Sequence, residues 1–248
     1  MARVPRVPFH FHAEGHAFSG EIHHPIWHPI EAKAATSLPT IGGHATAHVE
    51  NFSSQDFVSF KKAHTHVSGR QESKDVYVTH ATTTIEHFNI EDVLTADRII
   101  SRLTSVHDRQ HPEGVILANG SRFENLRISG HKVEVTLRYK LLEESHTFEQ
   151  LSKRVGSEKG TVAPSGTGVV ICSLVEKIET DLPYIPKDGG NVFEVPNFGK
   201  ITLAEIFAEA GTRTLTMMHL ELGSPQTLNA TLGETRTNGK PMPSGPGG

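Results

Sequence analysis

An internal repeat constrains the fold of this chain more than any other feature of its sequence. Residues 44–69 align without a gap with residues 80–105. Several residues recur unchanged at the same offset, and apolar positions between them keep their character. The unchanged pairs are His44/His80, Ala45/Ala81, Thr46/Thr82, Glu50/Glu86, Phe52/Phe88 and Asp56/Asp92. Similarity at a fixed period indicates that one supersecondary unit is built twice, and we expect the two units to lie in one sheet system.

Period-two alternation predicts that the first unit is a β-hairpin. Apolar and polar residues alternate over 45–49, a break follows at 53–54, and apolar residues resume at 57–60. Alternation of this kind places one face of a strand inward. Residues 69–75 are polar and turn-forming, so we expect the unit to end there.

The second unit contains an ambiguous element. Residues 76–90 are rich in threonine and isoleucine, which fit a pleated strand better than a helix. Residues 93–106 are compatible with a helix, because Val93, Ala96 and Ile100 have helical spacing. The gapless alignment with the first unit favours a strand, and we predict a strand here.

A four-residue pattern, apolar-Glu-x-apolar, recurs along the chain. It occurs at residues 49–52, 85–88, 123–126 and 175–178. The pattern is short, so chance occurrences are frequent. Its place within both repeat units nevertheless indicates strands that are built to a common plan.

Glycine and proline punctuate the whole chain. The 22 glycines and 14 prolines predict many turns and therefore many short strands. Strong alternation predicts longer strands over 132–142 and 215–222. Residues 143–155 contain the best helix candidate, with Thr147 as its N-cap. Residues 156–168 are expected to form a mobile loop.

Together these patterns predict a single all-β domain over residues 1–232. We expect an antiparallel β-sandwich or flattened barrel with one or two short helices. No shift in composition divides the chain into two domains. Residues 233–248, GETRTNGKPMPSGPGG, are expected to be a disordered tail.

Charge and hydropathy argue against several classes of protein. The formal net charge is −4, and no basic stripe is available to bind nucleic acid. The N-terminal segment lacks the apolar core of a secretory signal, and the longest apolar run, 169–172, is far too short to cross a bilayer. The single cysteine, Cys172, excludes an internal disulfide and is predicted to be buried and unreactive. We therefore expect a soluble protein, cytoplasmic by default.

Several short motifs occur in a characteristic order. They are a Gly-His-Ala-Phe opening, a small-residue strand after Gly-Gly, a strand ending in Thr-Ala-Asp, a Pro-x-x-Gly-x-Ile-Thr-Leu strand and a histidine-containing strand. They lie at residues 15–18, 42–47, 89–97, 196–203 and 218–222. In these motifs the chain resembles the bacterial choice-of-anchor P family. The resemblance implies a β-domain and an extracellular setting, and it brings no catalytic residues with it.

Histidine is the residue type that most suggests a binding site, since the chain contains 17 of them. His10 and His12 are two residues apart, as are His64 and His66, so each pair projects from one face of a strand. Two such imidazoles can bind a divalent metal once a third ligand arrives from a neighbouring element. These four residues are our candidate metal ligands, and no other cofactor is indicated. The simpler explanation is that they are polar-face residues of a histidine-rich chain.

The repeated acids, Asp56/Asp92 and Glu50/Glu86, allow two interpretations. They could bind calcium, or they could form a sheet-wide row of ion pairs with Lys61, Arg98 and Arg102. The simpler explanation is again structural, with these acids on a solvent-facing surface and the repeated aspartates capping turns.

No catalytic motif emerges from the sequence, so function is inferred from architecture. We favour a non-enzymatic structural or interaction protein that self-associates through the edges of its sheets as a homo-oligomer. The alternative is a β-barrel, with or without catalytic activity, that binds a small ligand or a metal through histidines at its mouth. A third hypothesis is a glycan-binding sandwich, for which one tryptophan and three tyrosines supply few stacking surfaces.

Overall fold

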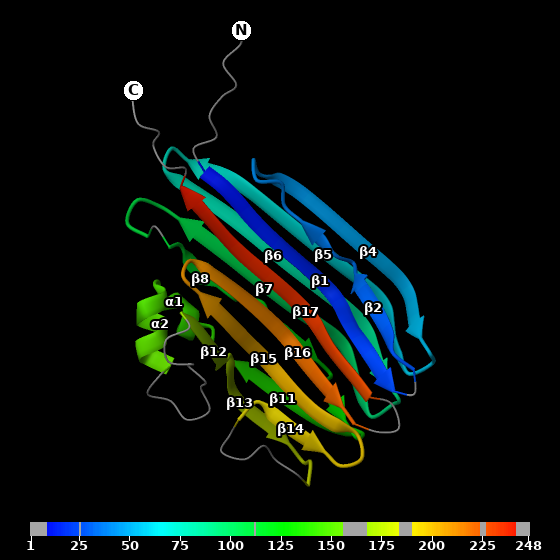
Figure 1. Ribbon diagram of the computed structural model, residues 1–248. Coiled ribbons are helices and arrows are strands. Elements are labelled where there is room, and N and C mark those ends of the chain that lie inside the picture. The colour runs from blue at the N-terminus through cyan, green and yellow to red at the C-terminus, as the bar shows by residue number, and fades with distance from the viewer. Residues whose placement is uncertain are drawn as a thin grey trace.

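A computed structural model describes residues 9–24, 26–111, 113–155, 168–183, 190–223 and 227–241. Two antiparallel sheets pack face to face, and two short helices lie at one side (Figure 1). The described part of the chain is an open sandwich and not a closed barrel. The prediction of an all-β sandwich is confirmed, whereas the barrel assumed in the ligand-binding hypothesis is wrong.

The first sheet, sheet A, contains both ends of the described chain. Its strands run in the order β12 (Val169–Ser173), β15 (Gly199–Glu209), β16 (Thr212–Leu222), β17 (Thr227–Pro241), β1 (Phe9–His24) and β2 (His28–Lys33). Two short strands are added, β14 (Val192–Val195) beside β15 and β3 (Thr36–Ser37) beside β1. The first and last strands are therefore neighbours at the centre of the sheet.

The second sheet, sheet B, contains the repeat. Its order is β13 (Val175–Thr180), β11 (His131–Leu137), β10 (Arg127–Ile128), β7 (Leu94–His107), β6 (Val76–Ile90), β5 (Val58–Ser73) and β4 (Gly43–Ser54). Strands β8 (Val115–Leu117) and β9 (Arg122–Glu124) also pair with β7. The helices α1 (Lys140–Glu143) and α2 (Phe148–Val155) follow β11.

The two similar segments form consecutive hairpins, β4–β5 and β6–β7. Residues 94–107 are a strand, as predicted: Leu94 and Ala96 point into the core, the alternation slips at Asp97 and Arg98, and Ile99 and Leu103 point into the core again. Each hairpin closes with a turn whose two central residues have positive φ, at 55–56 and at 91–92. This is the geometry of the type I′ turn, whose twist matches that of the flanking strands.

The apolar-Glu-x-apolar pattern corresponds to a reversal in the alternation of a strand. Residue x is Asn51, His87 or Asn125 in the first three occurrences, and φ is 51°, 53° and 50°. The left-handed residue, inside β4 and β6 and between β9 and β10, turns Glu and x to the same outer face, so both flanking apolar residues point inward. Lys177, the x of the fourth occurrence, has no positive φ.

Sheet A changes its alternation at the same level of the sandwich. Gly233 in β17 has φ of 60°, and Ala204 in β15 has φ of 46°. A Cβ atom on Gly233 would lie 3.3 Å from the Met217 side chain and 3.5 Å from Ile99 in β7 of the other sheet. The left-handed Gly233 of sheet A therefore packs against β7 of sheet B.

Buried hydroxyl groups link the sheets between two apolar clusters. The smaller cluster consists of Phe9, Phe11, Ala13, Leu38, Val67 and Ala81, and the rest of the core forms the larger one. Three pairs of hydroxyls, which we call the hydroxyl belt, are fully buried: Thr65/Thr83 at 3.1 Å, Ser101/Thr235 at 2.7 Å and Ser105/Thr237 at 3.1 Å. The last two pairs join β7 to β17 across the sandwich.

Several predicted boundaries need correction. Residues 233–241 form most of β17, although they were expected to belong to a disordered tail. Their inward positions hold Gly233 and two residues of the hydroxyl belt, Thr235 and Thr237. Residues 242–248 lie outside the described residues, as do residues 156–167 of the expected loop. Strand β5 continues to Ser73, through the segment predicted to be a turn.

The helix predicted within 143–155 is present as α2, which begins at Phe148, directly after Thr147. The strand predicted over 132–142 is shorter than expected, because β11 ends at Leu137 and is followed by α1. The Thr147 hydroxyl accepts a hydrogen bond from the Gln150 N–H at 3.1 Å, and Gln150 Oε1 accepts one from the Thr147 N–H at 3.2 Å. This reciprocal capping box confirms the predicted N-cap.

Candidate functional site

The four candidate metal ligands do not come together. Phe9 and Phe11 point into the core from β1, so His10 and His12 project from the outer face of sheet A. His64 and His66 alternate with buried residues of β5 and project from the outer face of sheet B. The two pairs therefore lie on opposite sides of the sandwich. Within one copy, the described residues contain no group of three or more His, Cys, Asp or Glu that could hold a metal.

The structure instead gathers histidines from three adjacent strands of sheet B. His64 is the direct cross-strand partner of His48, and both are exposed. His44, His66 and His80 occupy nearby outward positions on β4, β5 and β6. We call these five residues the histidine patch. The cross-strand pair of His48 with His64 could not be predicted, because the sequence does not show which strands are neighbours.

His80 is the member of the patch with a shifted pKa. Partial burial lowers the pKa of His80 below 6.5, and the positive charge of Arg102 lowers it further. Its Nδ1 atom lies 2.9 Å from the Thr104 hydroxyl of β7. His80 therefore favours the neutral form and is anchored against the sheet.

A row of ion pairs crosses sheet B beside the left-handed residues. Glu50 lies 3.6 Å from Lys62, and Arg98 lies 3.1 Å from Glu86 and 3.4 Å from Glu124. The predicted row is thus present, with Lys62 in the place expected for Lys61 and without Arg102. These side chains are substantially exposed, so each pair contributes at most about 1 kcal/mol.

Next to this row is an open polar hollow of about 390 Å³. Asn51, Lys61, His87 and Asp97 line it from four successive strands. Asn125 Nδ2 donates a hydrogen bond to Asp97 Oδ2 at 3.1 Å. The hollow arises because the left-handed residues and their neighbours all turn outward, and it contains no hydroxyl or thiol paired with a base.

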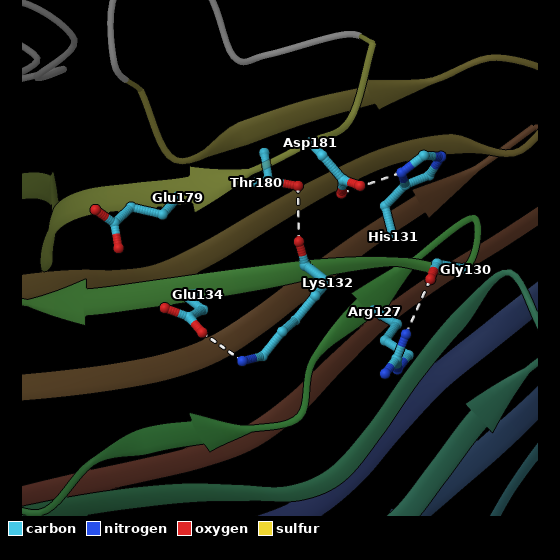
Figure 2. A pocket seen from close by; sticks show the side chains of 8 residues that line it. All are labelled: Arg127, Gly130, His131, Lys132, Glu134, Glu179, Thr180 and Asp181. Carbon is cyan, nitrogen blue, oxygen red and sulfur yellow. Dashed lines mark hydrogen bonds and ion pairs between the residues drawn. The ribbon is translucent and has the colours of Figure 1, made fainter.

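A second open hollow, of about 490 Å³, lies where β10, β11 and the end of β13 meet (Figure 2). His131 Nδ1 lies 3.1 Å from Asp181 Oδ1. The Thr180 hydroxyl, the one hydroxyl in the lining, donates to the Lys132 carbonyl at 2.8 Å. A base with an orienting carboxylate is present, but the Thr180 hydroxyl is engaged elsewhere, so the arrangement lacks the third element of a nucleophilic site.

The free edge of sheet B is the most unusual surface of the molecule. Strand β4 is twelve residues long, lies at the end of the sheet and pairs with β5 alone among the described strands (Figure 1). It contains no Lys, Arg or Pro. Its inward residues Ala45, Ala47 and Val49 remain half exposed, and Ile41 just before it is 72% exposed.

The other edges are protected in the usual ways. In sheet B, β13 has six residues and includes Lys177 and Glu179. In sheet A, β12 and β14 have five and four residues, and β2 includes Pro29. The strands that we expected to supply edges, 132–142 and 215–222, are internal, since β11 pairs with β10 and β13, and β16 with β15 and β17.

The buried polar groups of the core are structural. Cys172 is 2% exposed, as predicted. Arg213 is equally buried and donates hydrogen bonds to the carbonyls of Glu209 at 2.6 Å and Thr212 at 2.9 Å. Burial lowers the pKa of the Arg213 guanidinium, and its hydrogen bonds tie the start of β16 to the turn before it.

Comparison with known proteins gives one family. A family model described as a domain of unknown function, DUF8256, matches residues 9–163 and 143–209. This is a different family from the one that the short motifs resemble, and the match does not bear on that resemblance. No curated protein and no solved structure matches the chain. None of the described helices has the length and apolar character needed to span a membrane.

Proposed function

Because this chain belongs to the DUF8256 family, a family of unknown function, we propose its role from its own surface: it is a non-enzymatic interaction domain that self-associates through the free edge of β4. The observation that carries the proposal is the contrast between β4 and the other described edge strands. Those are short or contain proline, and β13 carries Lys177 and Glu179, whereas β4 is twelve residues long, contains no Lys, Arg or Pro, and has Glu50 as its single charged residue. Its unpaired N–H and C=O groups can pair with another strand.

A straight stretch of β4 determines how two copies pair. Gly43 and Asn51 have φ of 105° and 51°, so they bound an extended segment at 44–50. A two-fold symmetric pair places the same segment of both copies side by side and antiparallel. To use the whole segment, the axis passes through its central residue, Ala47.

This register brings complementary side chains together. On the inner face, Ala45 lies opposite Val49 of the second copy, which covers apolar side chains that are half exposed in one copy. On the outer face, His44 lies opposite Glu50 of the second copy. A shift by one residue would set the inner face of one copy against the outer face of the other. A shift by two residues would keep the faces matched but would leave part of the 44–50 segment without a partner.

The polar hollows support the non-enzymatic part of the proposal. The hollow at β10 and β11 has a histidine with a carboxylate but a threonine hydroxyl engaged by a backbone carbonyl. The lining of the hollow beside Asp97 includes the Ser59 and Thr95 hydroxyls, and neither has a hydrogen bond to a base among the described residues. Neither arrangement provides an activated nucleophile.

Sedimentation velocity over a wide range of protein concentration tests the proposal. The wild-type chain is expected to shift from single copies to pairs as concentration rises. Ala47→Lys should remain unpaired, because two lysines would meet at the axis on the inner face. Ile178→Lys is the matched control: it places a lysine at a half-buried position of β13, the opposite edge of the same sheet, and should pair like wild type.

Circular dichroism establishes that both lysine variants are folded before they are compared. A wild-type chain that stays unpaired at the highest concentration contradicts the proposal. So does an Ala47→Lys variant that pairs as well as wild type. The register is tested separately by mild oxidation, under which Ala47→Cys should cross-link to itself and Ala45→Cys should not, since residue 45 faces residue 49.

A further inference from the structure

The histidine patch meets the free edge of β4, where two copies would join. His48 and His64 are direct cross-strand partners, and both imidazoles are exposed on the outer face of sheet B. Directly opposed residues have Cβ atoms about 4.5–5.5 Å apart. The two rings are therefore placed to share one metal ion.

A single copy leaves this pair incomplete as a metal site. Zinc prefers four ligands in a tetrahedron and takes imidazole nitrogens readily. The described residues of one copy supply no third ligand of this kind at the pair. Any metal held by His48 and His64 alone would keep two positions open to water or to another chain.

The pairing register proposed above supplies the third ligand. With the two-fold axis at Ala47, His48 lies opposite Thr46 of the second copy and diagonal to His44 of the second copy. Diagonal neighbours on one face of a sheet have Cα atoms about 7–8 Å apart, within reach of long side chains. Two imidazoles that each approach a zinc ion to about 2.0–2.1 Å can span this separation.

We propose that zinc, or another divalent metal that prefers imidazole, joins two copies through His48, His64 and His44 of the second copy; this rests on the proposed function. By symmetry, each pair of copies holds two such sites. Glu50 lies opposite His44 of the second copy and is available as a fourth ligand or as its hydrogen-bond partner. Lys62, the nearest cation on β5, lies 3.6 Å from Glu50, which offsets its charge.

The test compares metal-free and zinc-loaded protein, purified without a histidine tag. Sedimentation velocity in chelator and in zinc gives the dissociation constant of the pair under both conditions, and titration calorimetry gives the zinc stoichiometry. For wild type we expect two zinc ions per pair and a dissociation constant lowered roughly tenfold or more. His64→Ala removes a ligand from β5 without touching the β4 edge, so its metal-free pairing should be unchanged and its zinc response lost.

His10→Ala is the matched control, because it removes an exposed histidine from the outer face of sheet A. It should respond to zinc like wild type. A zinc response in His64→Ala equal to that of wild type overturns the site, as does zinc binding that leaves pairing unchanged. The second result leaves the β4 pairing intact, whereas metal-free association that Ala47→Lys fails to weaken refutes the pairing itself.

Discussion

The hydroxyl belt provides a stringent test of how the two sheets are held together. Ser101 in β7 and Thr235 in β17 are both fully buried, and their hydroxyl oxygens are 2.7 Å apart. Thr235→Val keeps the shape of the side chain but leaves the Ser101 hydroxyl without this partner. A buried hydroxyl that loses its hydrogen bond costs about 1–3 kcal/mol. We therefore expect the free energy of unfolding to fall by about 2 kcal/mol.

Urea unfolding, followed by circular dichroism, measures this loss. The midpoint should fall while the slope stays constant, because the surface exposed on unfolding is unchanged. Ser101→Ala should cost a similar amount, since it leaves the Thr235 hydroxyl unpaired. The double variant removes both hydroxyls, so it should cost about 1 kcal/mol less than the sum of the single variants.

Thr214→Val is the control for the threonine-to-valine change itself, since Thr214 is half exposed on the outer face of β16. It should change stability by no more than about 0.5 kcal/mol. Single variants at Ser101 and Thr235 that behave like this control would refute the reasoning. Strict additivity in the double variant would also refute it, because independent side chains do not share one hydrogen bond.

Three further predictions follow from local geometry and charge. The pKa of His80 in the folded state is lowered, by burial first and then by the charge of Arg102. Its contribution to stability is therefore complete above the unfolded pKa of about 6.5 and is lost as the pH falls through that value. In urea unfolding, the loss of stability between pH 7.5 and pH 5 should be smaller for His80→Gln than for wild type. Gly233→Ala forces a left-handed residue to carry a Cβ atom 3.3 Å from Met217 and should cost about 1–2 kcal/mol in urea unfolding; an unchanged midpoint would contradict the assigned backbone conformation. Arg98→Gln should cost about 1 kcal/mol or less, and its effect should shrink in thermal melts at high salt; a salt-independent loss would indicate that Arg98 acts through packing.

The repeat allowed the most difficult secondary-structure assignment to be made from sequence. Residues 93–106 have helical spacing, yet they form β7, as their alignment with the first unit indicated. The same alignment could not reveal that Asn51 and His87 are left-handed. Asparagine tolerates this conformation well, but it is common in ordinary turns too, so its presence alone does not predict a reversal inside a strand.

The part of β17 after Leu232 was missed for a physical reason, whereas a short strand over 228–232 was expected. Its inward residues after Leu232 are Gly233, Thr235 and Thr237, which look like the composition of a loop. They are buried because the hydroxyls find partners on β7 of the other sheet. A hydrophobic pattern cannot show a core position that is satisfied by a hydrogen bond from a distant strand.

The candidate site could be predicted only in part. The sequence singled out His64 and His66, because their spacing places both on one face of a strand. It grouped them with His10 and His12, which belong to the other sheet. The partner that matters, His48, depends on the register of β4 against β5, and register is set by the turn at 55–56 and not by histidine spacing.

The left-handed residues also bear on how such a chain can vary in length. At Asn51 and His87 the in-and-out alternation of β4 and β6 slips by one step, Asn125 does the same between β9 and β10, and sheet A slips with them at Ala204 and Gly233. Deleting one of these residues would restore regular alternation in its own segment. The inward-facing residues of that segment would then no longer match those of the neighbouring strands. Insertions and deletions in relatives should therefore collect in the connections, while this line across the sandwich keeps its residue count.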